Sequence, residues 1–196
     1  MSRLDRLLGR LPWLMAMLIV GAIVHIVSVL ALPSLAPRDA FARLEALTPL
    51  NTFAPLPPTR PGAELLPFED SAIASGVCRY DLAAGPLRLR AQVVADRLLA
   101  FTFYSRQGQI FYAMTDRAAL RGAIDVRVVT AAQLEALEAR DPDDEPPQEL
   151  RLTSATPVGF IMVRAFAAQP GDLPDARARA ASVTCASEGK PQNASR

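Results

Sequence analysis

An uninterrupted apolar run near the amino terminus constrains the architecture of this chain more than any other feature. Residues 11–32 contain no Asp, Glu, Lys or Arg. A helix rises about 1.5 Å per residue, so these residues would extend roughly 33 Å, enough to cross a hydrocarbon core of about 30 Å. We therefore expect residues 11–32 to form a transmembrane helix that separates a short tail from the larger part of the chain.

The charges on the two sides of the run predict its orientation. Arg3, Arg6 and Arg10 precede the run against one acid, Asp5, whereas the far flank has no basic excess. Basic residues favour the cytoplasmic side of a membrane. We expect residues 1–10 to be a cytoplasmic basic tail at a bacterial inner membrane, and the larger carboxy-terminal part to lie in the periplasm.

A cleaved signal peptide is the alternative interpretation of the same run. Ser34, Leu35 and Ala36 resemble the small-x-small pattern that precedes a cleavage site. The run is longer than the roughly 7–15 residues of a signal-peptide core, and Pro37 would become the first residue of the mature protein. We therefore expect the run to be retained as a signal anchor.

The connection between the anchor and the expected domain, residues 33–67, divides into two parts. In residues 39–47 apolar side chains recur at helical spacing, which favours a short helix lying on the membrane surface. Residues 49–67 contain six prolines, and proline denies a helix its backbone hydrogen bonds. This composition favours an extended, polyproline-like stalk.

Residues 68–186 carry alternating strand and helix signals. Period-two alternation, a hairpin turn and a capping box from Thr130 to Gln133 predict mostly antiparallel strands with a few short helices. The strands are expected at 87–93, 98–104, 109–114, 124–129, 149–154 and 158–167, and the helices at 70–78, 131–139 and 174–183. The predicted fold class is therefore α+β, with one N-terminal transmembrane helix and one periplasmic domain. The polar tail, residues 187–196, is expected to be disordered.

The two cysteines, Cys78 and Cys185, lie near the start and the end of the expected domain. The periplasm is oxidising, and a bond between them would close a loop of about 100 residues. In the chain-entropy treatment such a bond stabilises a domain by about 4–5 kcal/mol. We predict this disulfide, and two free buried thiols are the alternative.

Composition disfavours several kinds of catalytic site in the exported part. His25, the only histidine, lies inside the apolar run, so this part has no histidine for a Ser-His-Asp site or a metal site. Lys190, the only lysine, lies in the polar tail, which disfavours lysine-based covalent catalysis. We therefore expect no enzyme, no catalytic residue and no cofactor.

The acidic residues and the overall charge disfavour a metal site and a nucleic-acid partner. Asp141, Asp143, Asp144 and Glu145 could hold a hard cation, but they lack the glycine and the distal glutamate of an EF-hand loop. A solvated acidic turn is therefore preferred, and no metal site is expected. The chain has 21 basic and 20 acidic residues with a formal net charge of +1, which disfavours a nucleic-acid partner.

His25 shares one face of the expected membrane helix with Gly21 and Ser28, at spacings of four and three residues. Such a face suits packing against a second membrane helix, because small residues permit close approach and polar side chains hydrogen-bond across the interface. Gly21, His25 and Ser28 are thus the candidate helix-packing face. A neutral imidazole bonded to a local carbonyl or to water is the alternative, and a proton relay or a haem ligand is a further one.

An aromatic set in the expected hairpin is the candidate lining of a ligand pocket. Alternation places half of a strand's side chains in the core, so only part of the set could face a ligand. The set comprises Phe101, Phe103, Tyr104, Phe111 and Tyr112.

Two groups of residues carry family resemblances. Residues 25–30, 35–44 and 77–87 resemble a family of uncharacterised single-span inner-membrane proteins of proteobacteria. Residues 81–87, 101–104 and 115–117 are similar to the domain of unknown function numbered twelve fifty-four. The resemblance implies that this domain is often fused to a companion domain. The present chain is too short to contain the companion, so a separate protein would supply it.

These observations predict a membrane-anchored periplasmic accessory or interaction protein of the cell envelope. Its expected partners are the lipid bilayer and another inner-membrane or periplasmic protein that supplies the companion domain, or a second copy of the chain. A periplasmic binding module for a small or lipidic envelope ligand is the alternative function.

Overall fold

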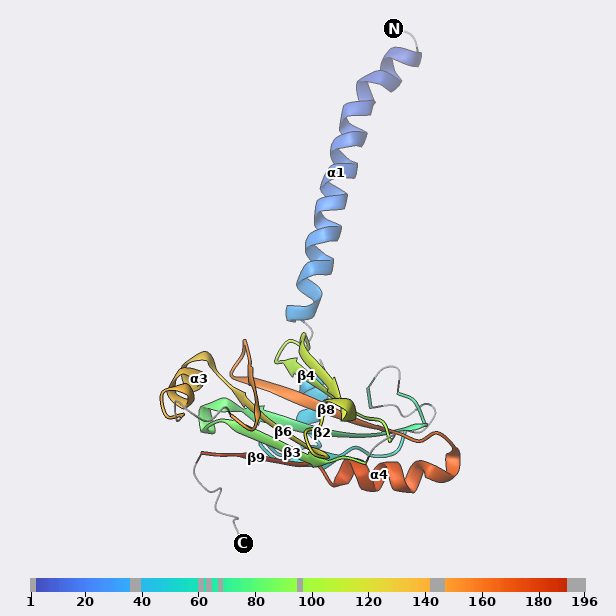
Figure 1. The fold of residues 1–196 in the computed structure, drawn as a ribbon. Coiled ribbons are helices and arrows are strands. Elements are labelled where there is room, and N and C mark those ends of the chain that lie inside the picture. Colours follow the sequence, from blue (N-terminus) through green and yellow to red (C-terminus); the bar gives the residue numbers. More distant parts are fainter. Residues whose placement is uncertain are drawn as a thin grey trace. The chain divides into compact units, whose positions relative to one another are not determined.

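The computed structural model describes residues 3–35, 40–59, 62, 65–66, 69–94, 97–141 and 147–189. The chain forms two compact units that divide between residues 39 and 40. Figure 1 traces both units.

The first unit contains one long helix, α1 (Arg3–Leu35). Its segment Arg10–Leu32 is long and apolar enough to cross a membrane, and none of it is buried within the protein. The expected helix over residues 11–32 is therefore confirmed, and its crossing of a membrane stays a prediction.

The second unit contains two β-sheets. The five-stranded sheet is antiparallel throughout, with the order β1 (Phe53–Pro55), β2 (Ile73–Asp81), β8 (Val158–Phe166), β4 (Leu99–Ser105) and β5 (Ile110–Thr115). The four-stranded sheet has the order β7 (Leu150–Thr153), β6 (Ala123–Val129), β3 (Leu87–Gln92) and β9 (Thr184–Ser187). In this second sheet only the pair β6 and β7 is parallel. The mostly antiparallel α+β domain is thus confirmed.

One apolar core lies between the two sheets. Alternate residues of each strand point inward, because successive side chains of a strand lie on opposite faces. The five-stranded sheet contributes Tyr80, Phe101 and Ile161, and the four-stranded sheet contributes Leu89 and Val126, all fully buried. The domain is therefore a sandwich whose inner faces share a single core.

Short helices and 3-10 turns lie before the first strand and in the connections between strands. They are α2 (Ala40–Glu45), α3 (Ala131–Glu138) and α4 (Leu173–Ala181), with single 3-10 turns η1 (Leu82–Ala84), η2 (Asp116–Ala118) and η3 (Pro170–Asp172). The capping box at the start of α3 is confirmed, since Thr130 and Gln133 exchange side-chain and backbone hydrogen bonds. Helix α4 contacts β2 and β8 through the buried residues Ala176 and Ala180. Helices α3 and α4 were both predicted.

The helix expected over residues 70–78 is wrong, because β2 begins at Ile73. Asp70 caps a tight turn instead, and its Oδ1 accepts a hydrogen bond from the Ala72 backbone nitrogen at 2.8 Å. Gly76 and the β-branched Val77 disfavour a helix, and β2 pairs with β1 on one side and β8 on the other. These long-range ladders outweigh the local capping signal.

The surface helix and the stalk expected over residues 33–67 need correction. Helix α2 does form, but its apolar residues Phe41 and Leu44 are buried against Val77 and Phe160 of the domain. Within the proline-rich segment, β1 pairs with β2 as a sheet strand. The domain therefore begins at Ala40, because the sheet offers both segments an apolar face and an open edge.

The carboxy-terminal end also differs from the prediction. Strand β9 (Thr184–Ser187) was not predicted, and its last residue falls in the tail expected to be disordered; the strand pairs with β3 and carries Cys185. Glu188 follows it and forms ion pairs with Arg88 and Arg127. Residues 190–196 of the predicted tail lie outside the described residues.

Candidate functional site

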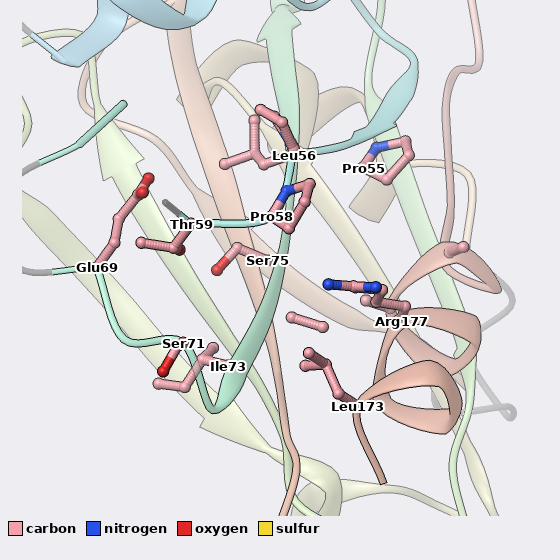
Figure 2. Close-up of a pocket in the computed structure, with 14 residues that line it drawn as sticks. Pro55, Leu56, Pro58, Thr59, Glu69, Ser71, Ile73, Ser75, Leu173 and Arg177 are labelled. Carbon is pink, nitrogen blue, oxygen red and sulfur yellow. The ribbon is translucent and has the colours of Figure 1, made fainter. Parts of the chain in front are cut away.

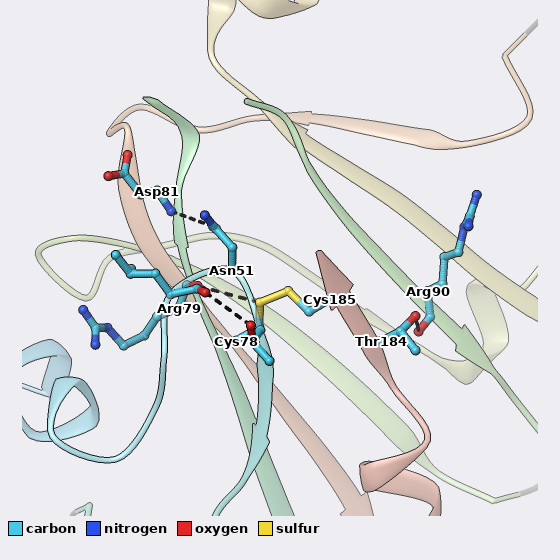
Figure 3. The surroundings of a disulfide bond; sticks show 9 residues. Asn51, Cys78, Arg79, Asp81, Arg90, Thr184 and Cys185 are labelled. Carbon is cyan, nitrogen blue, oxygen red and sulfur yellow. Dashed lines mark hydrogen bonds between the residues drawn. A yellow bond between two sulfur atoms is a disulfide. The ribbon is translucent and has the colours of Figure 1, made fainter. Parts of the chain in front are cut away.

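The predicted disulfide joins the two sheets. Cys78 of β2 and Cys185 of β9 are bonded, with their Cα atoms 6.4 Å apart, and Figure 3 shows the surroundings of the bond. Both residues belong to the buried core. The bond therefore fixes the last strand of the four-stranded sheet to an inner strand of the five-stranded sheet. Because it is buried, it is not an exposed redox site.

The edge of β2 beside the disulfide is held by Asn51. Its backbone has a positive φ of 56°, which asparagine tolerates better than most residues. The Asn51 backbone nitrogen donates to the Arg79 carbonyl at 2.7 Å, and its Oδ1 accepts from the Asp81 nitrogen at 3.0 Å (Figure 3). This contact secures the segment before β1 to the sheet.

A cavity of about 320 Å³ lies between the β1–β2 edge and α4 and is here called the edge cavity (Figure 2). Prolines create it. The Leu56 nitrogen makes a last ladder bond to the Ser75 carbonyl at 2.9 Å, and Pro57 and Pro58 have no N–H to continue the ladder. The chain therefore diverges from β2, and the start of α4, including Leu173, forms the opposite wall.

Two charged side chains lie on different sides of the edge cavity. Figure 2 shows Arg177 of α4 on one side and Glu69, which precedes β2, on the other. In the part of the chain that the structure describes, Arg177 has no hydrogen-bond or ion-pair partner. Its neighbour Arg179, by contrast, donates to the Phe166 carbonyl at 2.8 Å and pairs with Asp175 at 3.4 Å.

Glu69 is only partly engaged. Its Oε1 accepts a hydrogen bond from the Leu66 backbone nitrogen at 3.1 Å. A second, more open cavity of about 360 Å³ shares Glu69, Ile73 and Ser75 with the edge cavity and continues toward Arg164 of β8. The Glu69 carboxylate therefore borders two adjoining hollows on the same side of the sheet.

The candidate aromatic residues do not gather at one cavity. Phe101 and Phe103 are fully buried in the core, and Phe111 and Tyr112 pack on Phe103 with ring centroids 6.1 and 6.0 Å away. Tyr104 points to the other face and stacks on Phe160 at 4.6 Å. Among the cavities found in the described chain, the edge cavity and its neighbour are lined by none of the five.

The other sequence candidates are placed as follows. Gly21, His25 and Ser28 lie on α1, and a Cβ atom at Gly21 would meet no atom within 4 Å. Their role in helix packing stays a prediction. Of the acidic cluster, Asp141 pairs with Arg151, and residues 142–146 lie outside the described residues. Among the residues that the structure describes, no group of three His, Cys, Asp or Glu side chains could hold a metal ion.

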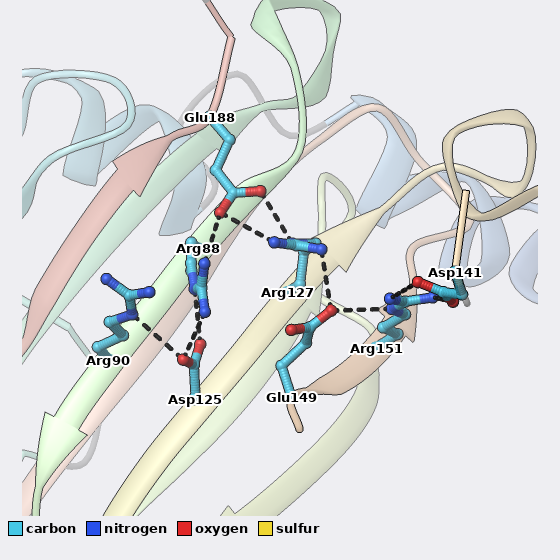
Figure 4. A network of polar contacts seen from close by, with 8 residues as sticks. All are labelled: Arg88, Arg90, Asp125, Arg127, Asp141, Glu149, Arg151 and Glu188. Carbon is cyan, nitrogen blue, oxygen red and sulfur yellow. Dashed lines mark hydrogen bonds and ion pairs between the residues drawn. The ribbon is translucent and has the colours of Figure 1, made fainter. Parts of the chain in front are cut away.

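The outer face of the four-stranded sheet carries a network of four arginines and four acids (Figure 4). Arg88 donates two parallel hydrogen bonds to Asp125, at 2.8 and 2.7 Å, and these bonds hold the pKa of Asp125 below its ordinary value. The remaining members are Arg90, Arg127, Arg151, Asp141, Glu149 and Glu188. The four arginines of this network are thus matched by four carboxylates.

The buried phenol of Tyr80 is a further group with a shifted pKa. Burial raises the pKa of Tyr80 to about 12, against a smaller lowering by its hydrogen bond with Ser154. The Tyr80 hydroxyl donates to the Tyr104 carbonyl at 3.1 Å and lies 3.0 Å from the Ser154 Oγ. Such a phenol stays protonated at neutral pH, and its hydrogen bond to the Tyr104 carbonyl ties β2 to β4.

Sequence reasoning missed the edge cavity. Its signal was present in Pro57 and Pro58, which directly follow an apolar residue able to end a strand, but these prolines were assigned to a stalk. Arg177 gave no signal, because a helical arginine is usually solvated.

Comparison with known proteins gives a family and a fold. The family model described as "Protein of unknown function (DUF1254)" matches residues 50–187. The chain is similar to the crystal structure of the VPA0106 protein from Vibrio parahaemolyticus, with a TM-score of 0.54 and 14% identity. That match covers 80% of this chain and 38% of the Vibrio chain. At this identity it shows a shared fold.

A further structure is less similar. An uncharacterized protein from Burkholderia cenocepacia gives a TM-score of 0.42 and 17% identity over 62% of this chain and 33% of that chain. No curated protein matches the chain.

Proposed function

Because the chain belongs to the family described as protein of unknown function (DUF1254), which brings no assigned activity, we propose a function from its geometry. The chain is a membrane-anchored accessory protein of the cell envelope whose exported domain binds another protein. The observation that carries this proposal is an apolar rim at one end of the sandwich.

The apolar rim comprises Val94, Leu98, Leu120 and Phe166, all exposed. Leu120 is 72% exposed and Val94 is 61% exposed. Backbone hydrogen bonds place these residues at the same end, since Val93 donates to Gly122 at 2.9 Å, Arg97 donates to Val94 at 3.3 Å and Phe166 donates to Leu98 at 3.1 Å. Clustered large apolar side chains on a water-facing surface favour a protein partner.

The companion domain is the partner that we propose for the apolar rim. The chain spans 38% of the Vibrio protein that shares its fold, so the same sandwich can be part of a longer polypeptide. We infer that a separate inner-membrane or periplasmic protein supplies the companion and covers the rim. A second copy of this chain is the other occupant that the test below would identify.

Our proposal places the amino terminus in the cytoplasm, α1 across the inner membrane and the domain in the periplasm. The length and apolar character of Arg10–Leu32 support the crossing, and the basic residues before it support the direction. The disulfide supports an oxidising compartment. A reporter enzyme active only in the periplasm, fused after residue 189, should be active in cells, and an inactive fusion would contradict this orientation.

Photocrosslinking tests the partner. A photoreactive amino acid at position 120 in the full chain, activated in intact cells, should form one discrete protein adduct. The matched control is position 107, an exposed residue of the β4–β5 turn at the other end of the same strands. Leu120→Asp should reduce an adduct formed from position 94 at least tenfold, with unchanged protein in the membrane. Equal adducts from positions 107 and 120, or none, would refute the rim as an interface.

A second candidate function is a periplasmic binding module for a small ligand. The edge cavity favours it, because about 320 Å³ is within the range of small-molecule sites and Arg177 faces it without a described protein partner.

A further inference from the structure

The edge cavity combines an apolar wall with two opposite charges. Its wall includes Pro55, Leu56, Ile73 and Leu173, while Glu69 and Arg177 lie on different sides (Figure 2). No hydrogen bond or ion pair joins these two charged groups within the described part of the chain. Each can therefore receive a ligand group of opposite charge.

The arginine is the stronger indication of a ligand. Some arginines of the domain are engaged by carboxylates, as Arg88 and Arg151 are. Arg177 instead directs its guanidinium toward the cavity (Figure 2). A guanidinium matches the planar geometry of a carboxylate through two parallel hydrogen bonds.

We propose that the edge cavity binds a small zwitterion with an apolar body, such as an apolar amino acid. Its carboxylate pairs with Arg177, its ammonium group pairs with Glu69, and its apolar body lies on the proline and leucine wall. The inference rests on the second candidate function and is independent of the apolar rim.

The size of the cavity agrees with this class of ligand. At about 30 Å³ per water molecule, 320 Å³ corresponds to roughly ten non-hydrogen atoms. Leucine has about nine, so the cavity has room for the whole molecule. Ser75 adds a hydroxyl between the charged groups, which can donate to the carboxylate or accept from the ammonium group (Figure 2).

The test is calorimetric titration of the full chain in detergent with leucine. Saturable binding of one leucine per chain is expected. N-acetyl-leucine, which lacks the ammonium charge, and leucinamide, which lacks the carboxylate, should each bind at least tenfold more weakly. Absence of saturable binding by leucine would overturn the proposal. Equal binding of N-acetyl-leucine would overturn the part assigned to Glu69.

Three variants locate the site. Arg177→Gln and Glu69→Gln should each raise the Kd for leucine at least tenfold. Arg117→Gln, which removes the same charge from an exposed site outside the cavity lining, should leave the Kd unchanged. Ala181→Phe, which fills the cavity from α4, should abolish binding without removing a charge. Unchanged binding by both Arg177→Gln and Ala181→Phe would place the leucine elsewhere and refute the site.

The two proposals fail separately. None of the cavity residues belongs to the apolar rim, so a negative titration leaves the crosslink from position 120 intact. A missing crosslink, in turn, leaves the leucine titration intact.

Discussion

Tyr80 lies directly across the ladder from Gly159, and its hydroxyl occupies the space that a side chain at Gly159 would need. The two residues are register partners of β2 and β8. A Cβ atom at Gly159 would come within 2.3 Å of both the Tyr80 Oη and the Tyr104 carbonyl oxygen. The glycine is therefore a condition for the buried hydrogen bond of Tyr80.

Gly159→Ala should destabilise the domain by about 2–4 kcal/mol, because overpacking displaces Tyr80 and weakens its hydrogen bonds. Denaturant unfolding of the full chain in detergent measures the change. Gly171→Ala is the matched control, since a Cβ atom there meets nothing within 4 Å. Equal stability of the two variants would show that Tyr80 moves aside freely.

Removal of the disulfide should weaken the whole sandwich. The sequence separation of 107 residues between Cys78 and Cys185 predicts a loss of about 4–5 kcal/mol in the double Cys→Ser variant. Because both cysteines are buried, dithiothreitol should reduce the bond only when denaturant is also present. Thiol labelling followed by mass spectrometry checks this, and rapid reduction of the native chain would contradict the buried placement.

The Asp125 carboxylate should make the stability depend on pH. Its pKa is lowered in the folded chain by Arg88, so its contribution is fully present above the unfolded value of about 3.9. That contribution is lost as the pH falls from about 5 toward the folded pKa. Both side chains are about one-quarter exposed, which limits the effect to about 1 kcal/mol.

Asp125→Asn should therefore be less stable than the natural chain at pH 7 and lose less stability between pH 5 and pH 3. Unfolding curves at several pH values measure the difference. Asp175→Asn is the control, because its carboxylate is 56% exposed and its ion pairs are longer, at 3.4 and 3.6 Å. Parallel pH profiles for Asp125→Asn and the natural chain would disprove the coupling.

Phe41 tests whether α2 belongs to the domain. Its ring contacts Phe160, and the guanidinium carbons of Arg79 and Arg106 lie 4.7 and 4.2 Å from its centroid. Phe41→Ala should cost about 3 kcal/mol, as truncation of a buried aromatic residue does. Leu47→Ala, at a residue 48% exposed, should cost little. A helix lying on the membrane surface would instead make both substitutions neutral to unfolding of the domain.

Local patterns predicted those parts of the fold that local chemistry determines. The β4–β5 hairpin, with Gly108 at a φ of 78°, and the capping box of α3 depend on residues close together in the sequence. Strand β2 was mistaken for a helix because its identity depends on pairing with β1 and β8, which lie far from it in the sequence. The disulfide was predictable, since compartment and cysteine count constrain it without knowledge of the fold.

The candidate sites also depended on contacts between residues far apart in the sequence, which local patterns do not predict. The proline-rich segment was expected to be a stalk, because proline composition alone does not show whether a sheet edge is available. Leu56, between Pro55 and Pro57, is the residue that uses this edge through its bond to Ser75. The aromatic hairpin was expected to line a pocket, yet Phe101 and Phe103 fill the core. Both outcomes depend on the second sheet and on α4, whose positions no local pattern specifies.

The polar face of α1 supplies the last prediction. Gly21, His25 and Ser28 recur at helical spacing within the segment that can cross a membrane, and such a face favours contact with another membrane helix. A photoreactive residue at position 25 in native membranes should capture a distinct protein. The control is position 27, which faces away from His25 on the same helix.

Gly21→Leu and Ser28→Leu should each reduce that capture severalfold, because larger side chains prevent close approach of a second helix. The amount of full chain in the membrane should stay the same. Capture of lipid alone from position 25, or equal capture from position 27, would refute the packing face. His25 would then be best explained by a hydrogen bond to a local carbonyl or to water.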